Sequence, residues 1–535
     1  MAGSGIAGGT STWVLATFAV YLVVLVGIGL WASKLMETVE DYVIGGRNVG
    51  PVVTGFSERA SEMSGWLALG VPGNAYSAGI IAFLNALGSI PADLLSWAGI
   101  AKRLRKFSEI TNTVTIPTFF EARLQDDSGA VRVISSVALI IFEGGYVGAQ
   151  IVAAGTLLQV VTGVEPWIGI VVGGVIVIGY TMLGGYLAVA WTDYIQGLII
   201  LLGFIVLPVL GYLRLGLPFG ELAAIGSSYT SITGGASGWA ALFGIISYAA
   251  IGLGWPGNPH IMVRFMGIDE VDNVRTAASV AQVFMIIAYV GAALVGLYAL
   301  AIFGQAADLA SNEVMPMLTI ELLPGPIAGV ILAAALAAMM SSADSQLLIA
   351  SSAVVEDVYH GLLNQDASPE TLKTYSQYAT LGLGAASVTF AFLAKGTPVY
   401  TLVLSYAFGG LGAALGPTLV AALWWKRATA PGAVASMLVG TVSMLVWPHF
   451  PSLLGELEAG TFFAEFVNVY GLFPAFVLSS LVLVGVSLAT QPPSEEDVDA
   501  AFDIFSMPID AISEDTLEEH GFETRTQTPD ELRHD

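Results

Sequence analysis

Runs of apolar residues long enough to cross a membrane recur along almost the whole chain. A spanning helix needs about 20 mostly apolar residues, and by this measure the sequence contains about thirteen segments. Only 11% of the residues are charged and 55% are hydrophobic, whereas soluble domains carry about 25% charged residues. The sequence therefore predicts an all-α polytopic membrane protein. The segments centre near residues 22, 65, 91, 145, 175, 202, 250, 290, 340, 385, 410, 440 and 476.

Composition excludes several classes of protein. Cysteine is absent, so disulfides, cysteine-ligated zinc and thiol catalysis are all excluded. The net charge of -24, with 18 Lys+Arg against 42 Asp+Glu, argues against nucleic-acid binding, which needs a basic surface. Part of the excess acid lies in residues 491–535, which contain no long apolar run and are predicted to form a solvated tail. Acids also crowd the loops, which indicates a salt-adapted source, with an interacting tail as the alternative.

The basic residues predict the orientation. The first segment, Thr12 to Ala32, is as long as a full span, so we expect an uncleaved helix rather than a signal peptide. If the N-terminus lies on the outer side of the membrane, only Arg214 and Lys395 fall on that side, and the acidic tail is cytoplasmic. Thirteen other basic residues then fall on the cytoplasmic side, namely Lys34, Arg47, Lys102, Arg103, Arg105, Lys106, Arg123, Arg132, Arg264, Arg275, Lys373, Lys426 and Arg427.

Two of the segments are interrupted by glycine and proline. Residues 54–80 contain Gly65, Gly70 and Pro72, and residues 247–261 read GLGWPGNP between 252 and 259. Such density unwinds a helix, and freed carbonyls in lipid are tolerated only beside protein or a water-filled cavity. Two broken helices five segments apart predict an inverted repeat of five plus five helices, with substrate and ions bound at the breaks. Glycine used only for close helix packing is the alternative.

This spacing divides the chain into five parts. We expect residues 1–40 to form an extra N-terminal helix, residues 41–215 the first five-helix repeat and residues 235–427 the second repeat. We expect residues 428–490 to add two C-terminal helices and residues 491–535 to form the acidic tail.

Charged residues cluster in the first interrupted segment. Glu58, Arg59 and Glu62 fall within two helical turns, where each buried charge costs about 2.5 to 3.5 kcal/mol on insertion scales. Such charges usually serve a function. The alternative for Arg59 and Glu62 is a self-satisfied ion pair at i, i+3. For Glu58 the alternative is a solvated position near the cytoplasmic interface.

Polar groups elsewhere suggest an ion site. Ser341 and Ser342 lie inside a long apolar helix and offer neutral oxygens that suit Na⁺ opposite freed carbonyls. The alternative is a serine hydroxyl bonded to the carbonyl four residues earlier. Asp344 is a second ion contact, a proton carrier or a helix-end charge, and Asp193 either acts in coupling or favours a helix N-terminus. Three aromatic residues either wall a small pocket or pack, namely Trp66, Tyr146 and Trp255.

Several short motifs in the right order resemble one known family. The chain is similar to the sodium:solute symporter family, and within it to bacterial sodium/proline symporters, over about residues 42–489. The resemblance implies thirteen helices, a leucine-transporter-type core and alternating access. The motifs are Gly45-Gly46-Arg47, Gly50-Pro51, Ala60-Ser61-Glu62-Met63-Ser64-Gly65-Trp66, Gly184-Gly185, Trp191-Thr192-Asp193, Gly257-Asn258-Pro259-His260, Arg264-Phe265-Met266, Met340-Ser341-Ser342, Trp425-Lys426-Arg427 and Gly432-Ala433.

The resemblance also implies roles for individual residues. Sodium would bind the carbonyls of Ala60, Met63 and Ala338 and the hydroxyls of Ser341 and Ser342. The solute cavity would be lined by Glu62, Ser64, Gly65, Trp66, Tyr146, Trp255 and Pro259. Coupling would involve Arg47, Glu62 and Asp193, to which the position of Asp344 adds a further candidate.

This chain departs from the proline carriers around the solute. Glu62 replaces an aspartate, Ile251 a tryptophan and Trp255 a tyrosine, while Glu58 and Arg59 stand where small residues are usual. These departures imply a changed pocket, so another amino acid, a betaine or a short carboxylate are alternatives to proline.

Together these observations predict a secondary active transporter that couples Na⁺ to a small zwitterionic solute, with proline as the first candidate. Proton coupling through Glu62 or Asp344 is the alternative within transport. A membrane sensor is the alternative from another class, although the tail has no glycine-rich nucleotide loop. An enzyme is not expected, because the five histidines show no metal-ligand spacing and no nucleophile has an evident base. The expected partners are the solute, sodium and lipid, while the oligomeric state is left open.

Overall fold

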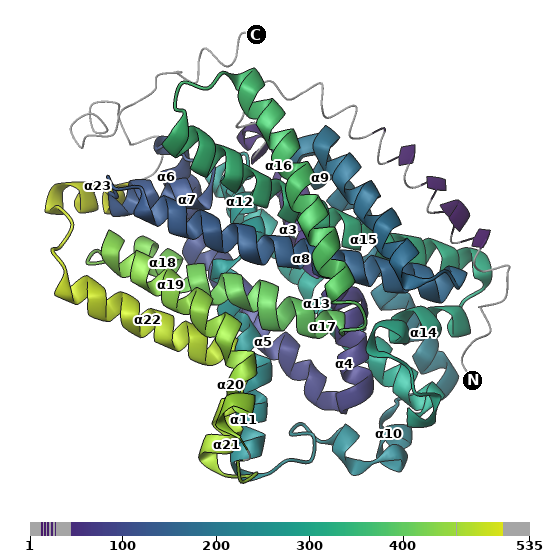
Figure 1. Cartoon of the computed structure of the whole chain (residues 1–535). Helices are drawn as coiled ribbons and strands as arrows, with labels where there is room; N and C mark the ends of the chain where they lie inside the picture. The colour runs from purple at the N-terminus through teal and green to yellow at the C-terminus, as the bar shows by residue number, and fades with distance from the viewer. Residues whose placement is uncertain are drawn as a thin grey trace.

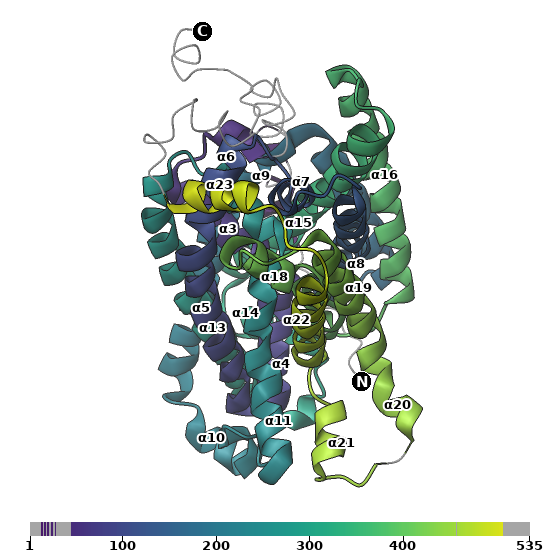
Figure 2. The ribbon, with the colours of Figure 1, turned by 90° about the vertical axis from the view of Figure 1, so that its left-hand side faces the viewer.

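The computed structural model describes residues 44–455 and 457–506, together with scattered positions between 12 and 27. Within this part every regular element is a helix, and one isolated bridge joins Val49 to Ile268. The helices form one bundle, shown in two views (Figures 1 and 2). Most of residues 1–43, including most of the predicted N-terminal helix, lie outside the described residues.

The helices follow one another along the chain with short connections, and η marks stretches of 3₁₀ or π geometry. The first group is η1 (Gly45–Arg47), α3 (Pro51–Gly65), η2 (Trp66–Gly70), α4 (Val71–Ala78), η3 (Gly79–Phe83), α5 (Leu84–Ser96), η4 (Trp97–Ala101), α6 (Lys102–Ile110), α7 (Ile116–Leu124), α8 (Ala130–Thr162) and α9 (Pro166–Leu215). The second is α10 (Phe219–Ile225), η5 (Ser227–Thr230), α11 (Gly238–Ala249), η6 (Ala250–Gly257), α12 (Pro259–Gly267), η7 (Val271–Asn273), α13 (Val274–Phe303), η8 (Gln305–Ala307), η9 (Ser311–Glu313), α14 (Val314–Leu322), α15 (Gly325–Ser352) and η10 (Ala353–Leu363). The third is α16 (Pro369–Leu393), α17 (Val399–Leu402), η11 (Val403–Phe408), α18 (Gly409–Trp424), α19 (Ala430–Val446), η12 (Trp447–His449), α20 (Phe450–Leu454), α21 (Phe462–Val467), α22 (Leu472–Ala489) and α23 (Glu495–Ser506).

Nine helical segments of the described chain are long and apolar enough to cross a membrane. This confirms the all-α membrane class, while the number thirteen stays a prediction. The segments are Pro51–Ile110, Ala130–Thr162, Val189–Leu215, Gly238–Gly257, Val271–Phe303, Gly325–Leu363, Val399–Trp424, Ala430–Leu454 and Leu472–Ala489.

Both predicted interruptions are present. In α3, Ser64 leaves helical geometry with φ 38° and ψ -174°, and π geometry follows over Trp66–Gly70. In the second segment, α11 passes into a 3₁₀ stretch, Asn258 is extended, and α12 begins at Pro259. Proline suits the first helical position, where no N–H bond is needed. The sequence therefore breaks both helices where glycine and proline concentrate.

The broken helices lie inside the bundle against long continuous ones. α15 packs against α3, α8 and α9, and α13 packs against α3 and α9. η6 packs against α18 and α5, where Gly257 comes so close to α18 that an added Cβ would lie 2.5 Å from the Leu411 carbonyl oxygen. Close backbone approach of this kind is the use of small residues in membrane bundles. The core of the molecule is thus built around α3, η6, α12 and α15.

The first part of the acidic tail is folded. The helix α23 lies beside α6 at one end of the bundle (Figure 2). Phe505 is buried with its ring 5.7 Å from that of Phe107, and Lys426 lies 2.5 Å from Asp499. The expectation of a solvated tail is therefore wrong for this helix, because its apolar face finds a partner on α6.

Candidate functional site

The break in α3 exposes main-chain groups that side chains then satisfy. The Gly65 N–H donates to Gln150 Oε1 of α8 at 2.7 Å, and the Trp66 N–H donates to Ser64 Oγ at 3.3 Å. Ser64 and Gly65 are both buried. A non-glycine residue at positive φ is strained, and such strain persists only where the surroundings enforce it. The break in α3 is therefore held in place by the packing and hydrogen bonds of the core.

The two serines of α15 lie directly against α3. Ser342 Oγ is 3.4 Å from the Ala60 carbonyl oxygen and 3.0 Å from that of Ala338, while Ser341 Oγ is 3.2 Å from the Ala338 oxygen. Both hydroxyls are buried. The structure thus brings together four of the five predicted sodium ligands. The carbonyl of the fifth, Met63, accepts the Trp66 N–H one turn farther along α3.

These contacts modify the alternative of simple serine back-bonding. Both hydroxyls do bond within α15, as that alternative expects. Ser342 also reaches across to Ala60 on another helix, so neutral oxygens from two helices converge. Hard monovalent cations bind such oxygen sets.

Glu62 lies beside the break and is fully buried. Its Oε1 accepts hydrogen bonds from Trp66 Nε1 at 3.2 Å and from the Tyr289 hydroxyl at 3.0 Å. Its Oε2 lies 3.7 Å from Arg59 Nη1, and neither atom has a hydrogen-bond partner among the described residues. The i, i+3 ion pair is therefore present but loose, and one carboxylate oxygen is left for another ligand.

Arg59 is held chiefly by two other carboxylates. It pairs with the adjacent Glu58, and its Nη2 is 3.1 Å from Asp93 Oδ1 of α5. All three groups are fully buried, so the suggested solvated position of Glu58 is wrong. Asp93 also accepts a hydrogen bond from Trp255 Nε1 at 3.2 Å and another from Gln282. This cluster ties α3 to α5, η6 and α13.

Asp193 joins a second buried cluster. It accepts hydrogen bonds from Ser57 at 2.8 Å and Ser61 at 2.7 Å, and Arg264 Nη2 lies 3.3 Å away. Arg264 in turn reaches Ser345 of α15 at 2.8 Å. Asp193 lies within α9 rather than at a helix start, so the helix N-terminus alternative is wrong.

The other two coupling candidates occupy different surroundings. Asp344 is buried within α15 and accepts a hydrogen bond from Thr181 at 2.7 Å. It is therefore not a helix-end charge. Arg47 donates to the backbone carbonyls of Ser108 and Thr113 at 2.8 and 3.2 Å, which ties η1 to the end of α6. Its role in coupling stays a prediction.

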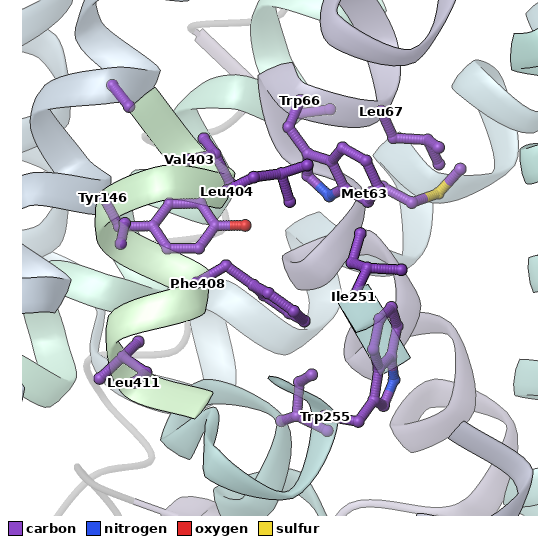
Figure 3. Close-up of a cluster of buried hydrophobic side chains, with 14 of the residues drawn as sticks. Met63, Trp66, Leu67, Tyr146, Ile251, Trp255, Val403, Leu404, Phe408 and Leu411 are labelled. Carbon is purple, nitrogen blue, oxygen red and sulfur yellow. The ribbon is translucent and has the colours of Figure 1, made fainter. Parts of the chain in front are cut away.

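Aromatic side chains gather between the two broken helices (Figure 3). Trp66, Tyr146 and Trp255 are fully buried and are drawn together with Ile251 and Phe408. The rings of Trp255 and Phe408 lie 5.2 Å apart, nearly edge to face. Pro259 is buried where α12 begins. The predicted solute-binding residues thus lie around the two breaks, although their role stays a prediction.

Several buried polar residues were missed by sequence reasoning. Asp93 and Glu143 are single acids in apolar runs, and an ionisable residue inside a membrane segment is a functional candidate by default. That signal was available for both. Gln150 and Gln282 carry weaker signals, because their partners lie 85 and 189 residues away in the sequence.

Comparison with known proteins identifies the family. The profile of the sodium:solute symporter family matches residues 42–440. The chain belongs to the sodium:solute symporter family. The osmoregulated proline transporter of Bacillus subtilis is 33% identical over 490 residues, which cover 90% of this chain and 96% of that protein. The high-affinity proline transporter of the same bacterium is 35% identical over 478 residues, covering 88% and 97%.

A solved structure supports the fold of this family member. A Na⁺-coupled sialic acid symporter matches with a TM-score of 0.72 at 20% identity, covering 90% of this chain and 99% of that one. At this identity the likeness concerns the fold alone. The leucine-transporter-type core that the resemblance implied is thereby confirmed.

Proposed function

We propose that this chain is a sodium-coupled symporter of a small zwitterionic solute, with proline as the first candidate. The observation that supports it best is the approach of Ser342 to the Ala60 carbonyl, because it brings a hydroxyl of the continuous α15 against a main-chain oxygen of the broken α3. Membership of the sodium:solute symporter family and the names of the related transporters agree with it.

Sodium would act by holding α3 against α15. The carbonyls of Ala60, Met63 and Ala338 and the hydroxyls of Ser341 and Ser342 would bind the ion in place of water. A ligand shifts a conformational equilibrium only through its different affinity for the two states. If sodium binds the outward-open state better, it forms the solute site, and solute binding then permits closure and inward release. Reciprocal linkage of the two ligands couples the fluxes.

The solute would lie next to this ion, between the two breaks. Ser64, Gly65, Trp66, Tyr146, Trp255 and Pro259 would line its cavity. Glu62 Oε2, which accepts no hydrogen bond from the described residues and is only loosely paired with Arg59, offers an acceptor for a solute ammonium group. Asp93 fixes the indole of Trp255, so the wall of the cavity depends on a carboxylate that does not itself belong to it. Arg47, Asp193 and Asp344 remain candidates for coupling the ion to closure.

We further propose that the chain lies in the plasma membrane with its N-terminus outside and α23 in the cytoplasm. The excess of basic residues on one side supports this orientation. In this frame residues 41–215 and 235–427 are the two repeats, preceded by a helix within 1–40 and followed by two helices in 428–490 and the tail, 491–535.

The test is solute uptake into proteoliposomes containing the purified protein. Labelled proline, a betaine and a short carboxylate are each offered under an inward sodium gradient, an inward proton gradient or neither. We expect proline to accumulate above its external concentration only with the sodium gradient. Accumulation driven by the proton gradient alone would favour coupling through Glu62 or Asp344. No accumulation of any solute would contradict the proposed function.

The sensor alternative is tested with a truncated chain. Ending the protein after Ser506 removes residues 507–535 and keeps α23 with its contacts to α6. A transporter should accumulate solute as before, whereas loss of every solute response would favour a signalling tail.

A further inference from the structure

A carboxylate that is not part of the proposed solute cavity holds the indole of Trp255. Trp255 Nε1 of η6 donates to Asp93 Oδ1 of α5 at 3.2 Å, and both side chains are fully buried. The indole N–H is the sole hydrogen-bonding group of a tryptophan side chain, and it can only donate. The bond to Asp93 therefore uses the whole hydrogen-bonding capacity of this ring.

Asp93 is itself held from two other helices. Its Oδ1 also accepts from Arg59 Nη2 of α3 at 3.1 Å, and its Oδ2 accepts from Gln282 Nε2 of α13. Hydrogen bonds between two ionised groups, as between Arg59 and Asp93, are among the strong ones. Asp93 thus offers Trp255 an acceptor whose place is set by α3 and α13 rather than by η6.

Two further contacts orient the indole ring. The guanidinium carbon of Arg59 lies over the ring, 5.8 Å from its centroid, which is within the range of a cation–π contact. The ring of Phe408 in η11 meets the indole nearly edge to face. In Figure 3 the indole nitrogen lies on the side of the ring away from Phe408 and Tyr146. The ring therefore turns carbon atoms, and not its N–H, toward the aromatic group between the two breaks.

This arrangement gives the proposed cavity a wall that donates no hydrogen bond at Trp255. An apolar wall favours a part of the solute that carries only carbon and hydrogen, because a hydroxyl buried against it loses its hydrogen bonds to water. A freed indole N–H would have the opposite preference, because a buried donor without a partner is costly. The bond to Asp93 decides between these two preferences.

We propose that Asp93 is a positioning residue that makes this chain select apolar over hydroxylated solutes, acting through the indole of Trp255. The inference rests on the proposed transport function and on the place of Trp255 in the solute cavity. Asp93 acts without touching the solute. It holds the N–H of Trp255 away from the cavity, so that the carbon ring of a solute such as proline meets only indole carbons.

A purely structural role for Asp93 would give a different result. If Asp93 only tied α5 to α3, its loss would slow the uptake of every solute by a similar factor, and the ratio between two solutes would stay the same. A role through Trp255 changes that ratio. The ratio of the kcat/KM values for two solutes is therefore the quantity that separates the two roles.

The experiment measures sodium-driven uptake of proline and of the hydroxyprolines with the hydroxyl on Cβ or Cγ, in proteoliposomes. Asp93→Leu removes the acceptor and frees the indole N–H, so the preference for proline over at least one hydroxyproline should fall about fivefold or more. Asp93→Asn keeps an oxygen that can accept from Trp255, so its ratio should stay near that of the wild type. In both variants Arg59 keeps Glu58 and Glu62 as partners, so no buried cation is left alone.

A double variant tests whether the effect passes through Trp255. Trp255→Phe keeps an aromatic ring and removes the N–H, so Asp93→Leu should change the solute ratio no further in that background. Trp447→Phe is the control, because it removes an indole N–H that donates to the Val469 carbonyl, away from both breaks; its ratio should equal that of the wild type. The proposal is overturned if Asp93→Leu leaves the ratio unchanged, or changes it equally in both backgrounds.

A further variant covers the case in which Asp93→Leu is not recovered as folded protein. Gln282→Leu leaves every charge of the cluster in place and frees only Asp93 Oδ2, so the preference for proline should fall in the same direction by a smaller factor. In that case an unchanged ratio in Gln282→Leu overturns the proposal.

The same assay separates this inference from the proposed function. If the wild type accumulates another solute of the panel instead of proline, that solute is compared with its own hydroxylated analogue. A wild type that accumulates no solute contradicts the proposed function and this inference with it. Uptake with a selectivity that does not depend on Asp93 contradicts this inference alone.

Discussion

Replacing Gly257 with alanine tests whether the second break must pack directly on α18. The added Cβ would lie 2.5 Å from the Leu411 carbonyl oxygen, 2.6 Å from Gly412 Cα and 2.9 Å from Gly416 N. All three atoms are backbone, so no side chain can rotate away. The shortest distance is about 0.9 Å below ordinary contact, and overpacking of this kind costs typically about 1–3 kcal/mol.

This strain falls on the segment that leads into Asn258 and Pro259. A cost of about 1–3 kcal/mol corresponds to a change of about 5- to 150-fold in a conformational equilibrium. We therefore expect Gly257→Ala to lower the initial rate of sodium-driven uptake by about tenfold or more in proteoliposomes with matched protein content. Gly244→Ala is the control, because an added Cβ on this α11 residue meets nothing within 4 Å. Wild-type uptake by Gly257→Ala would refute the close packing of η6 on α18 as a requirement for transport.

Three further results are expected. Arg59→Met removes the cation shared by three buried carboxylates and should lower the free energy of unfolding by about 3–5 kcal/mol, seen as a large fall in melting temperature in detergent. Arg214→Met breaks an exposed pair and should lower it by under about 1 kcal/mol. Equal effects would contradict the burial of the cluster. Gln150→Leu leaves the Gly65 N–H at the α3 break without its acceptor. Because an unsatisfied buried donor costs about 1–3 kcal/mol, the solute-binding state should be less stable and the half-saturating solute concentration should rise. An unchanged concentration would show that the bond is dispensable. Phe505→Ala removes the ring that packs on α6 and should speed hydrogen exchange in residues 495–506, while unchanged exchange would mean that the ring does not hold the helix.

Sequence reasoning located the breaks because their cause is local. Glycine and proline concentrated around Gly65 and from Gly252 to Pro259 weaken helical geometry through their own backbones, so both interruptions are visible without a structure. The same holds for the long apolar runs. These two local signals predicted the fold class and the region of the candidate site.

The partners of the buried charges were not predictable because they are distant in sequence. Arg59 meets Asp93 from another helix, and Glu143 meets His260 117 residues away. Helix periodicity says which face a residue occupies, but not which neighbouring helix that face meets. For the same reason the sequence alone allows Glu58 to lie in solvent and Asp193 to lie at the start of a helix. In the structure both side chains are buried inside the bundle.

The sodium requirement of uptake tests the central claim most directly, namely that the α3 break and the α15 hydroxyls bind the driving ion. Ser342→Ala removes an oxygen that touches Ala60, and a hydrogen-bonding partner of a charged group is worth about 1.5–3 kcal/mol. The half-saturating sodium concentration should therefore rise about tenfold or more. Ser351→Ala is the matched control, because its buried hydroxyl donates to the Leu348 carbonyl of the same helix. A wild-type sodium requirement in Ser342→Ala, with solute uptake intact, would contradict the account.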